Sequence, residues 1–463
     1  MKWEKVKLGE IALCITKGTT PSNVGDTFVK QGIKYIRSEL ISSSRRISDE
    51  GLLYISELTH QKLSRSQLQE NDILFSIAGV YLGKTALLRK TDIPANTNQA
   101  VGIIRLDNKK CCINYIYYYL NLRSVVNYIN RLSSQAAQPN INLTQLSNIS
   151  IFLPPLPIQE RIADILSAYD DLIENNQKQI KLLEEAAQRL YKEWFVDFRF
   201  PGHETTPIVD GIPEGWEKKP AEVFFNITIG KTPPRAESKW FSDRREDIPW
   251  ASISDMGQSG VYLTDTSEYL TREAVDVFNI STAPTGSVLL SFKLTVGRVR
   301  INSVPMCTNE AIAHFHIDDP VLRQYTFHYL SNFNYEELGN TSSISKAINS
   351  KKIKMMPFIM PTRNILEKYY HVANPIFESI LVKQQEIASL KEARDRLLPK
   401  LMNGEIDVME KAKKEMPSDR FDHIRRHWEN VPYDPNQFAL AARADGQLTE
   451  EEVKKLKDIA EEE

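Results

Sequence analysis

The chain has 463 residues, which is too long for one compact domain. Of these residues 41% are hydrophobic and 25% charged, an ordinary globular composition. Its net charge of -2 does not indicate any class of partner. The charge is unevenly spread, however. Residues 1–154 carry 19 Lys and Arg against 11 Asp and Glu, residues 212–361 carry 16 against 17, and residues 404–463 carry 10 against 16. The basic first segment is compatible with phosphate contacts and equally with a solvated surface.

The cysteines and the apolar runs exclude several further classes. Cys14, Cys111, Cys112 and Cys307 form no CxxC pair, so neither a disulfide framework nor a zinc site is indicated. The chain does not open with a secretory signal pattern, and no apolar run has the length needed to span a bilayer. We therefore expect a soluble protein of the reducing cytoplasm.

The first part of the chain reads as short strands separated by turns, with "IKYIRS", "DILFSIA" and "QAVGIIRL" as the strand-like runs. "SIAGVYLGKTALL", from Ser76 to Leu88, also matches the relaxed P-loop pattern. A P-loop must open directly into a helix, whereas the residues after Thr85 have little helical periodicity and reach a proline at Pro94. A β-hairpin is therefore predicted here, and nucleotide binding is the less favoured alternative.

A long helix is predicted after "LPPLPIQE", from Ile158 to about Phe195. Apolar residues recur in it with a seven-residue period, interrupted once by a polar Asn, which is typical of a coiled coil. The residues of this seam are Leu166, Ile173, Asn176, Ile180, Leu183 and Leu190.

The second part of the chain repeats the first. "WEKVKLGEIALCITKGTTP" aligns with "WEKKPAEVFFNITIGKTPP", which places Gly18 on Gly230. "DILFSIAGVYLGKTALL" aligns with "SVLLSFKLTVGRVRI", and "PANTNQAVGIIRLD" aligns with "PMCTNEAIAHFHID". An ordered series of matches of this kind indicates two copies of a unit of about 200 residues, each a strand-rich region followed by a long helix.

The second helix is predicted from Ile365 to about Leu398, with Pro375 as a site of a kink or restart and Pro399 and Gly404 as stop signals. Polar Lys383 takes the place of the first seam's Asn. Its seam residues are Ile376, Ile380, Lys383, Ile387, Leu390 and Leu397. Two equivalent seams most simply pack on each other as a spacer, and a helical hairpin that completes a core is the alternative.

The residues that would carry catalysis or metal binding do not form a constellation. We find no Gly-rich methyl-donor loop, and "YDPNQF" at Tyr433–Phe438 lacks the second proline of an amino-methyltransferase motif. His314 and His316 stand two apart on a strand-like run without a third ligand, which favours a structural role over a metal site.

At this point the chain resembles the specificity (S) subunits of type I restriction-modification enzymes. The residues that carry the resemblance are "SSQAAQPNINLTQLSNISIFLPPLPIQERIADIL" at Ser133–Leu166, the helix after it, and "ARDRLLPKLMNGEIDV" near the end of the second helix. The resemblance covers about residues 1–408.

The resemblance implies an α+β fold of two strand-rich target-recognition domains in tandem repeat, separated by two long antiparallel coiled-coil helices with pseudo-twofold symmetry. The expected order is recognition domain 1 at 1–154, first spacer helix at 155–198, linker at 199–211, recognition domain 2 at 212–361, second spacer helix at 362–403 and an acidic C-terminal extension at 404–463. Each domain would read one half of an asymmetric bipartite DNA target.

The resemblance also implies a chain without catalytic activity. Its partners would be double-stranded DNA, two modification (methyltransferase) subunits docked on the helices, and restriction (motor and nuclease) subunits. This chain would bind no cofactor or metal itself, whereas S-adenosylmethionine, ATP and Mg would serve the partner subunits. A DNA-recognition subunit of another methylation or phage-defence complex is the alternative.

Candidate DNA contacts follow from residue type and position only, because both copies place small, hydroxyl or basic residues at turns, where glycine permits close approach and the polar groups suit phosphates and base edges. Ordinary hairpin turns would have the same composition. The candidates are Lys17, Thr19, Thr20, Arg37, Ser38, Lys84, Lys231, Arg235, Ser252 and Arg298.

The C-terminal extension departs from the family, whose members commonly stop near "LMNGEIDV". "TEEE" at Thr449–Glu452 is a capping box that predicts a short helix, and "SDRFDHIRRHWENV" predicts another. The extension could dock a partner subunit, mimic DNA in autoinhibition, or remain a solvated appendage, and docking is favoured.

Overall fold

The structure is a computed structural model of the chain, and it describes residues 3–41, 47–133, 139–258, 260–339 and 348–408. These residues divide into two compact units, one formed by residues up to 163 together with those from 398 onward, the other by residues 164–397. The two long helices predicted from Ile158 to about Phe195 and from Ile365 to about Leu398 both form. The helices predicted beyond residue 408 lie outside the described residues.

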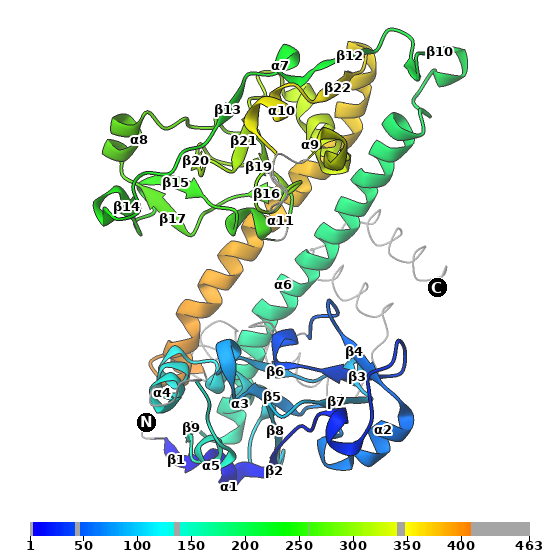
Figure 1. The fold of residues 1–463 in the computed structure, drawn as a ribbon. Helices are drawn as coiled ribbons and strands as arrows, with labels where there is room; N and C mark the ends of the chain where they lie inside the picture. The colour runs from blue at the N-terminus through cyan, green and yellow to red at the C-terminus, as the bar shows by residue number, and fades with distance from the viewer. Residues whose placement is uncertain (1–2, 42–46, 134–138, 259, 340–347, 409–463) are drawn as a thin grey trace, which may run out of the picture. The chain divides into compact units, whose positions relative to one another are not determined.

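The strands of the first unit form three sheets, ordered β2-β8-β5-β6, β4-β3-β7 and β1-β9 (Figure 1). In chain order the strands are β1 Glu4–Lys7, β2 Ala12–Lys17, β3 Ile33–Ile36, β4 Leu53–Ile55, β5 Ile73–Ser76, β6 Thr85–Leu87, β7 Ala95–Thr97, β8 Val101–Leu106 and β9 Ser150–Leu153. The short helices are α1 Leu8–Ile11, α2 Glu57–Lys62, α3 Ile113–Leu120, α4 Arg123–Ser133 and α5 Leu143–Ser147. All strand pairs are antiparallel except β3 with β7.

The second unit repeats this topology with additions at the sheet edges. Its sheets are ordered β13-β21-β18-β19-β16, β14-β17-β15-β20, β12-β22 and β10-β11. The strands are β10 Ile208–Val209, β11 Ile212–Pro213, β12 Glu217–Pro220, β13 Ile227–Ile229, β14 Phe241–Ser242, β15 Ile248–Ala251, β16 Tyr262–Leu263, β17 Glu268–Leu270, β18 Val288–Ser291, β19 Val299–Asn302, β20 Cys307–Thr308, β21 Ile312–Phe315 and β22 Pro357–Met360. The short helices are α7 Ala221–Phe224, α8 Arg272–Phe278, α9 Arg323–Asn332 and α10 Ser350–Lys354.

Equivalent hydrogen bonds confirm that the two copies share one fold. The Tyr115 hydroxyl donates to the carbonyl of Phe152 at 2.7 Å, and the Tyr325 hydroxyl donates to that of Ile359 at 2.5 Å. In each copy a tyrosine of the helix after the sheet thereby holds the last strand before the long helix. Buried tyrosines of this kind need a partner for the hydroxyl, and the repeated partner explains why both copies keep the residue.

The long helices are α6, Leu156–Tyr191, extended by a π-helical turn at Lys192–Val196, and α11, Arg363–Met402. Within the second unit they pack antiparallel, because Asn176 donates to Glu386 at 3.0 Å while Asp170, earlier on α6, pairs with Arg394, later on α11, at 2.6 Å. The predicted fold class, strand-rich regions separated by long helices, is confirmed.

Two details of the second helix differ from the prediction. Helix α11 runs without a break through Pro375 and Pro399 and ends at Met402, before Gly404, which has a φ of 71°. Pro375 lies on the exposed side, so its ring points to solvent, while Ala373, Phe377 and Ile380 on the inner side are fully buried. Burial of that face outweighs the one backbone hydrogen bond that proline removes.

The burial of the seam residues is graded along the helices. Leu166, Ile173, Asn176, Ile180 and Ile380 are buried. The others are partly buried, namely Leu183, Leu190, Ile376, Lys383, Ile387, Leu390 and Leu397. Phe377, which the seven-residue pattern did not select, is more deeply buried than its neighbour Ile376 because it packs on Phe327 with ring centroids 5.6 Å apart.

The described helices include none that is both long and apolar enough to cross a membrane. All four cysteines are free thiols, with Cys111 and Cys307 buried.

Candidate nucleic-acid interface

In the first copy, one edge of the sheets gathers the candidate residues. Strands β2, β3, β5 and β7 end there and β8 begins there, so that the turns after Lys17, Ile36, Ser76 and Thr97 lie together. Two hydrogen bonds tie the turns, from the amide of Thr19 to the carbonyl of Thr97 at 2.9 Å and from the Thr97 hydroxyl to the carbonyl of Ile36 at 2.6 Å. We call this the polar edge of the first copy.

Glycine is required at the centre of the polar edge. A Cβ atom built on Gly18 would lie 2.1 Å from the carbonyl oxygen of Thr97 and 2.3 Å from that of Asn98, both backbone atoms that cannot move aside. In the second copy, a Cβ atom on Gly230 would lie 2.1 Å from Thr308 Oγ1 and 2.3 Å from the carbonyl oxygen of Asn309. The aligned glycines therefore serve the same close approach of two chain segments.

The threonine two residues after each of these glycines pairs with the aligned polar residue of the neighbouring turn. Thr20 donates to Gln99 in the first copy, and Thr232 donates to Glu310 in the second. The hydrogen bond from Thr232 and the nearby cations lower the pKa of Glu310, so this edge carries a carboxylate where the first copy carries a neutral amide. The sequence comparison aligned Gln99 with Glu310 but did not select either as a site residue.

An aromatic side chain supports the same turn in both copies. The Tyr35 hydroxyl donates to the carbonyl of Thr19 at 3.1 Å, and Trp250 Nε1 donates to the carbonyl of Lys231 at 3.2 Å. Burial raises the pKa of Tyr35 to about 12, so the hydroxyl stays protonated as a donor. The turn is thus positioned by a buried ring in each copy.

The Thr19 hydroxyl also accepts a hydrogen bond from the Arg65 guanidinium at 3.3 Å. The sequence comparison did not select this cation as a site residue.

Lys84 stands in a hairpin and not in a phosphate-binding loop. Thr85 begins strand β6, which pairs antiparallel with β5, so no helix follows the Gly-Lys-Thr triplet. The amide of Gly83 donates to the carbonyl of Ser76 at 2.9 Å, which closes the turn. The exposed Lys84 ammonium lies 4.9 Å from the ring centroid of Tyr81. The P-loop alternative is wrong, because the amides of Gly79, Leu82, Gly83 and Lys84 already donate to backbone carbonyls and no helix follows them.

Arg37 and Ser38 follow β3 at the same edge but are less available. The Arg37 guanidinium pairs with Glu39 at 2.6 Å and donates to the carbonyl of Gly51 at 3.3 Å. Ser38 is buried, with 8% of its surface exposed. Lys17, at the end of β2, is exposed.

The second copy has the equivalent polar edge, where β13, β15, β18 and β20 end and β21 begins. Arg235 lies there with its guanidinium 4.2 Å from the ring centroid of Phe241 and 4.6 Å from that of Trp250. Its two terminal nitrogens pair with both carboxylate oxygens of Glu268, at 2.6 and 3.0 Å. The exposed guanidinium is therefore held flat and in one orientation.

The remaining candidates of the second copy contact the protein. The Lys231 ammonium donates to the carbonyl of Phe278 at 2.8 Å. The Ser252 hydroxyl donates to Asp255 at 2.6 Å, and the Ser267 hydroxyl donates to the same carboxylate at 2.9 Å. Burial would raise the pKa of Asp255, but the hydrogen bonds from Ser252 and Ser267 outweigh it, so the pKa lies below its usual value. Sequence reasoning could not anticipate this buried carboxylate.

Arg298 anchors the second hairpin to the turn after β15. Its guanidinium donates to the carbonyl of Ile253 at 2.8 Å and lies against Gly257, where a Cβ atom would be 2.7 Å from Nη1. Its aligned counterpart, Lys84, contacts its own hairpin instead. Both copies thus have a basic residue at this aligned position, but its contacts differ between the two copies.

His314 of β21 and His316, just after that strand, have partners within the protein. The Thr228 hydroxyl lies 3.1 Å from His314 Nδ1 and 2.9 Å from His316 Nε2, and the Thr308 hydroxyl lies 2.7 Å from His314 Nε2. Burial lowers the pKa of His314 to about 3. Both ring nitrogens of His314 are therefore used in structural hydrogen bonds, and no cluster able to hold a metal ion occurs among the residues that the structure describes.

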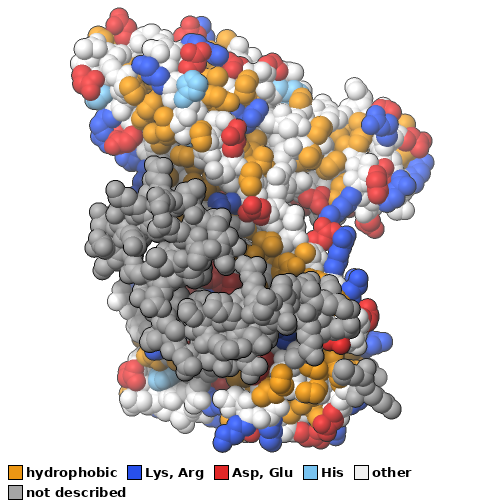
Figure 2. Space-filling view, turned by 180° about the vertical axis from the view of Figure 1, so that it is seen from behind, with side chains coloured by type: hydrophobic (Ala, Val, Ile, Leu, Met, Phe, Trp, Pro, Cys, Tyr) orange, Lys and Arg blue, Asp and Glu red, His pale blue; other side chains and the backbone are white. Residues whose placement is uncertain are grey.

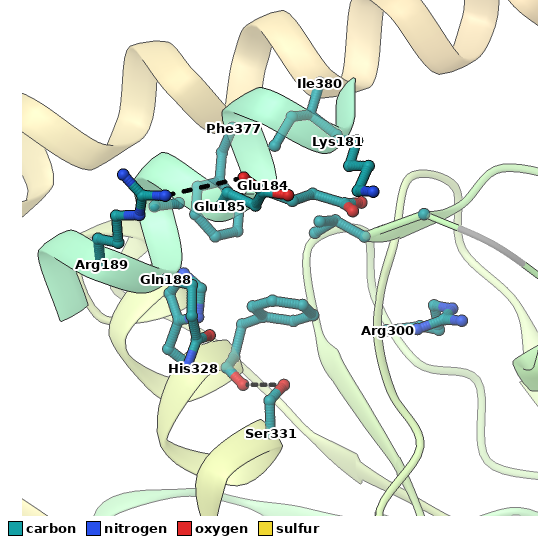
Figure 3. A pocket seen from close by; sticks show the side chains of 14 residues that line it. Lys181, Glu184, Glu185, Gln188, Arg189, Arg300, His328, Ser331, Phe377 and Ile380 are labelled. Atoms are coloured by element: carbon teal, nitrogen blue, oxygen red, sulfur yellow. Dashed lines mark hydrogen bonds and ion pairs between the residues drawn. The ribbon is translucent and has the colours of Figure 1, made fainter. Parts of the chain in front are cut away.

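The second unit also contains a cavity of about 600 Å³ between α6, α9, α11 and β19 (Figure 3). Its wall includes Glu184, whose pKa is raised by burial, and Arg300, whose pKa is lowered by burial. His328 lines it as well, stacked on Tyr191 with ring centroids 5.2 Å apart. In the described part of the chain, neither ring nitrogen of His328 has a hydrogen-bond partner. The lining is mixed in charge and does not by itself select a ligand.

The described surface has no single dominant charge on the face drawn in Figure 2, where Lys and Arg are interspersed with Asp and Glu. Any anion recognition on this face must therefore come from local groups. The described part of the chain thus holds two copies of one strand-rich fold, each with a polar edge of hydroxyl and basic side chains.

Comparison with known proteins identifies the family. A family model described as the type I restriction modification DNA specificity domain matches residues 1–185 and 213–411. The chain belongs to this family. It is a DNA specificity subunit of a type I restriction-modification system, which is the non-catalytic subunit of such an enzyme.

Individual relatives agree. The chain is 27% identical over 423 residues to the MjaIX specificity subunit of Methanocaldococcus jannaschii, covering 88% of this chain and 94% of that protein. It is 26% identical over 331 residues to the HindI specificity subunit of Haemophilus influenzae, covering 58% of this chain and 71% of that protein. The structure of the type I restriction-modification S subunit from M. genitalium has a similar fold, with a TM-score of 0.53 at 16% identity over 86% of this chain and 96% of that one.

Proposed function

We propose that residues 1–154 and 212–361 are two target-recognition domains that each read one half of an asymmetric, bipartite DNA sequence. The observation that carries the proposal is the pair of polar edges, which share one backbone frame but differ in the groups they present. Gln99 is replaced by Glu310 and Lys84 by Arg298 within that frame. Two different half-sites present different base edges, so recognising them requires different hydrogen-bonding groups on the same backbone frame.

In this proposal the helical segments 155–198 and 362–403 set the distance between the half-sites and dock two methyltransferase subunits, with 199–211 as a linker. The methyltransferase subunits would use S-adenosylmethionine, and restriction subunits would use ATP and Mg. The assembly would act in the cytoplasm. The segment 404–463 would dock a partner subunit, and all but its first residues lie outside the described part of the chain.

The ten candidate residues differ in how they would act on DNA. Exposed groups such as Lys17 and Lys84 would contact phosphates directly, and Arg235 would present an oriented guanidinium. Ser252 and Arg298 would act by positioning their turns, since the protein already uses their side chains. Thr19, Thr20, Arg37, Ser38 and Lys231 belong to the same turns.

The test uses the complex of this chain with its methyltransferase subunits. Adenine methylation mapped across the genome of a strain carrying the complex should give one sequence with two different half-sites and an unread gap. Purification should give two methyltransferase subunits per chain. A continuous or palindromic target, or an equimolar complex, would contradict the proposal.

Lys84→Ala tests the contribution of one exposed cation. We expect the complex to bind its target more weakly at all sequences, with the slope of log affinity against log salt reduced by about 1. Lys90→Ala, which removes another exposed lysine of the same copy, is the matched control. If the isolated parent chain bound ATP and the Lys84→Ala chain did not, the result would instead support nucleotide binding at this hairpin.

A further inference from the structure

The tips of the two aligned hairpins each expose an aliphatic side chain. Val80, between β5 and β6, has 89% of its surface exposed, and Leu294, between β18 and β19, has 77%. Among the described residues these are the two most exposed large hydrophobic side chains. A single exposed aliphatic residue needs no explanation, but one at the tip of the aligned hairpin in each copy does, although the two hairpins differ in length by one residue.

The backbone at the second tip is strained. Leu294 has a φ of 63°, in the left-handed region that bulky residues rarely adopt. The amide of Thr295 donates to the carbonyl of Lys293 at 2.8 Å, which closes a three-residue turn around Leu294. Glycine or asparagine would occupy this position at lower cost, so both the exposure and the conformation of Leu294 are unfavourable in the free protein.

Both hairpins are anchored at their bases to the polar edges. The amide of Ile77 donates to the carbonyl of Ala100 at 2.9 Å, and the amide of Phe292 donates to that of Ala311 at 2.9 Å. In the second hairpin the Ser291 hydroxyl also donates to the carbonyl of Thr295 at 2.5 Å. The exposed side chains therefore project from fixed bases beside the turns that carry the DNA-contact candidates.

A cation flanks each tip. Lys84 is exposed at the base of the first hairpin, and Lys293 precedes Leu294 with its ammonium 5.5 Å from the ring centroid of Phe292. An aliphatic tip flanked by a lysine suits a polyanion with an apolar interior, since the ammonium can contact a phosphate while the side chain reaches the bases. Duplex DNA has this chemistry.

We propose that Val80 and Leu294 are wedges, each of which enters a groove of the bound duplex and partly unstacks a base step within its own half-site. The inference rests on the proposed function, because it assigns one tip to each recognition domain. Each wedge would make its half-site sensitive to how easily that base step deforms, which adds specificity without hydrogen bonds to bases.

The test uses the complex with its methyltransferase subunits and duplexes that carry the mapped target with 2-aminopurine substituted at successive positions. Binding should raise the fluorescence at one step in each half-site, as unstacking does. Leu294→Ala should abolish the rise in one half-site and Val80→Ala that in the other, each with a loss of affinity of about 5- to 20-fold. Leu58→Ala and Val277→Ala, at residues 61% and 59% exposed, are the matched controls.

Leu294→Gly separates a DNA-contact role from a structural one. Glycine relieves the left-handed conformation, so the thermal midpoint of the complex should stay the same or rise while target affinity falls. A lower midpoint would make Leu294 a packing residue and overturn the proposal for it. Tip variants that bind like the controls, in a complex that binds its bipartite target, would overturn the wedges alone. A parent complex without a bipartite target would overturn the proposed function itself.

Discussion

Replacing Gly230 by alanine tests whether the close approach at the polar edge is what the repeat preserves. The new Cβ would lie 2.1 Å from Thr308 Oγ1 and 2.3 Å from the carbonyl oxygen of Asn309, well inside contact distance. The segments must separate, which breaks the hydrogen bonds from Gly230 to Ile312 at 3.1 Å and from Lys231 to Thr308 at 2.8 Å.

The expected cost follows from these two effects. Each lost backbone hydrogen bond costs about 1 kcal/mol net, and displacement of packed segments costs about 1–3 kcal/mol. Gly230→Ala should therefore lower the free energy of unfolding of the second copy by about 3–5 kcal/mol. Gly18→Ala should do the same to the first copy, since its Cβ would lie 2.1 Å from the carbonyl oxygen of Thr97.

The assay combines stability with specificity. Hydrogen exchange on each variant complex should show increased exchange in the copy that carries the change. Methylation mapping should show relaxed recognition of one half-site for Gly18→Ala and of the other for Gly230→Ala. Gly25→Ala is the control, because Gly25 has a φ of 77° and nothing within 4 Å of its Cβ position, so it should cost only about 1–2 kcal/mol. Native stability and an unchanged target for both edge variants would refute the reasoning.

Three further predictions concern the rest of the chain. His328 is buried, which lowers its pKa to about 3. Below the unfolded pKa of about 6.5 the unfolded chain therefore binds a proton at this residue that the folded protein does not bind. Stability should thus fall by about 1.4 kcal/mol per pH unit as the pH drops below that value. His328→Phe should remove this share of the slope in acid denaturation, and an unchanged slope would contradict the burial argument. Asp170→Ala leaves Arg394, whose side chain is 20% exposed, without its partner on α6, and should cost about 1–3 kcal/mol in chemical denaturation. Asp395→Ala, which removes a partner 64% exposed, should cost at most about 1 kcal/mol, and equal effects would show that the interhelix pair adds nothing. Deleting one heptad from both long helices shortens each by about 10 Å, and should shorten the unread gap in mapped methylation sites without altering either half-site. An unchanged gap would refute the role of the helices as a ruler.

Local pattern was sufficient for the elements whose signal lies in neighbouring residues. The hairpin at Ser76–Leu88 was predictable because no helical periodicity follows Thr85, and β6 forms there. The long helices were predictable because a seven-residue apolar period selects one structure, and they form as α6 and α11. Self-comparison of the chain added the repeat. The sheets β2-β8-β5-β6 and β13-β21-β18-β19-β16 confirm it, because their strand orders correspond apart from the added β16.

Local rules failed where distant residues decide the outcome. Pro375 predicted a kink or restart and Pro399 predicted a stop, yet α11 continues through both. The helix is buried beside each proline, at Ala373 and Phe377 near the first and at Leu401 and Met402 near the second. The seven-residue pattern likewise passed over Phe377, whose burial depends on Phe327 of another helix.

The sequence by itself determined the repeat, the element types and the family, because these depend on residue order within short windows and on the match between the two copies. Only the tertiary structure decided what each polar side chain faces. In the folded chain Ser252 donates to the buried Asp255, and Arg235 packs against the rings of Phe241 and Trp250. The side chains of Lys84, Val80 and Leu294 are exposed to solvent. The physical reason is that hydrogen-bond partners and exposure come from segments far apart in the chain, which no local pattern specifies.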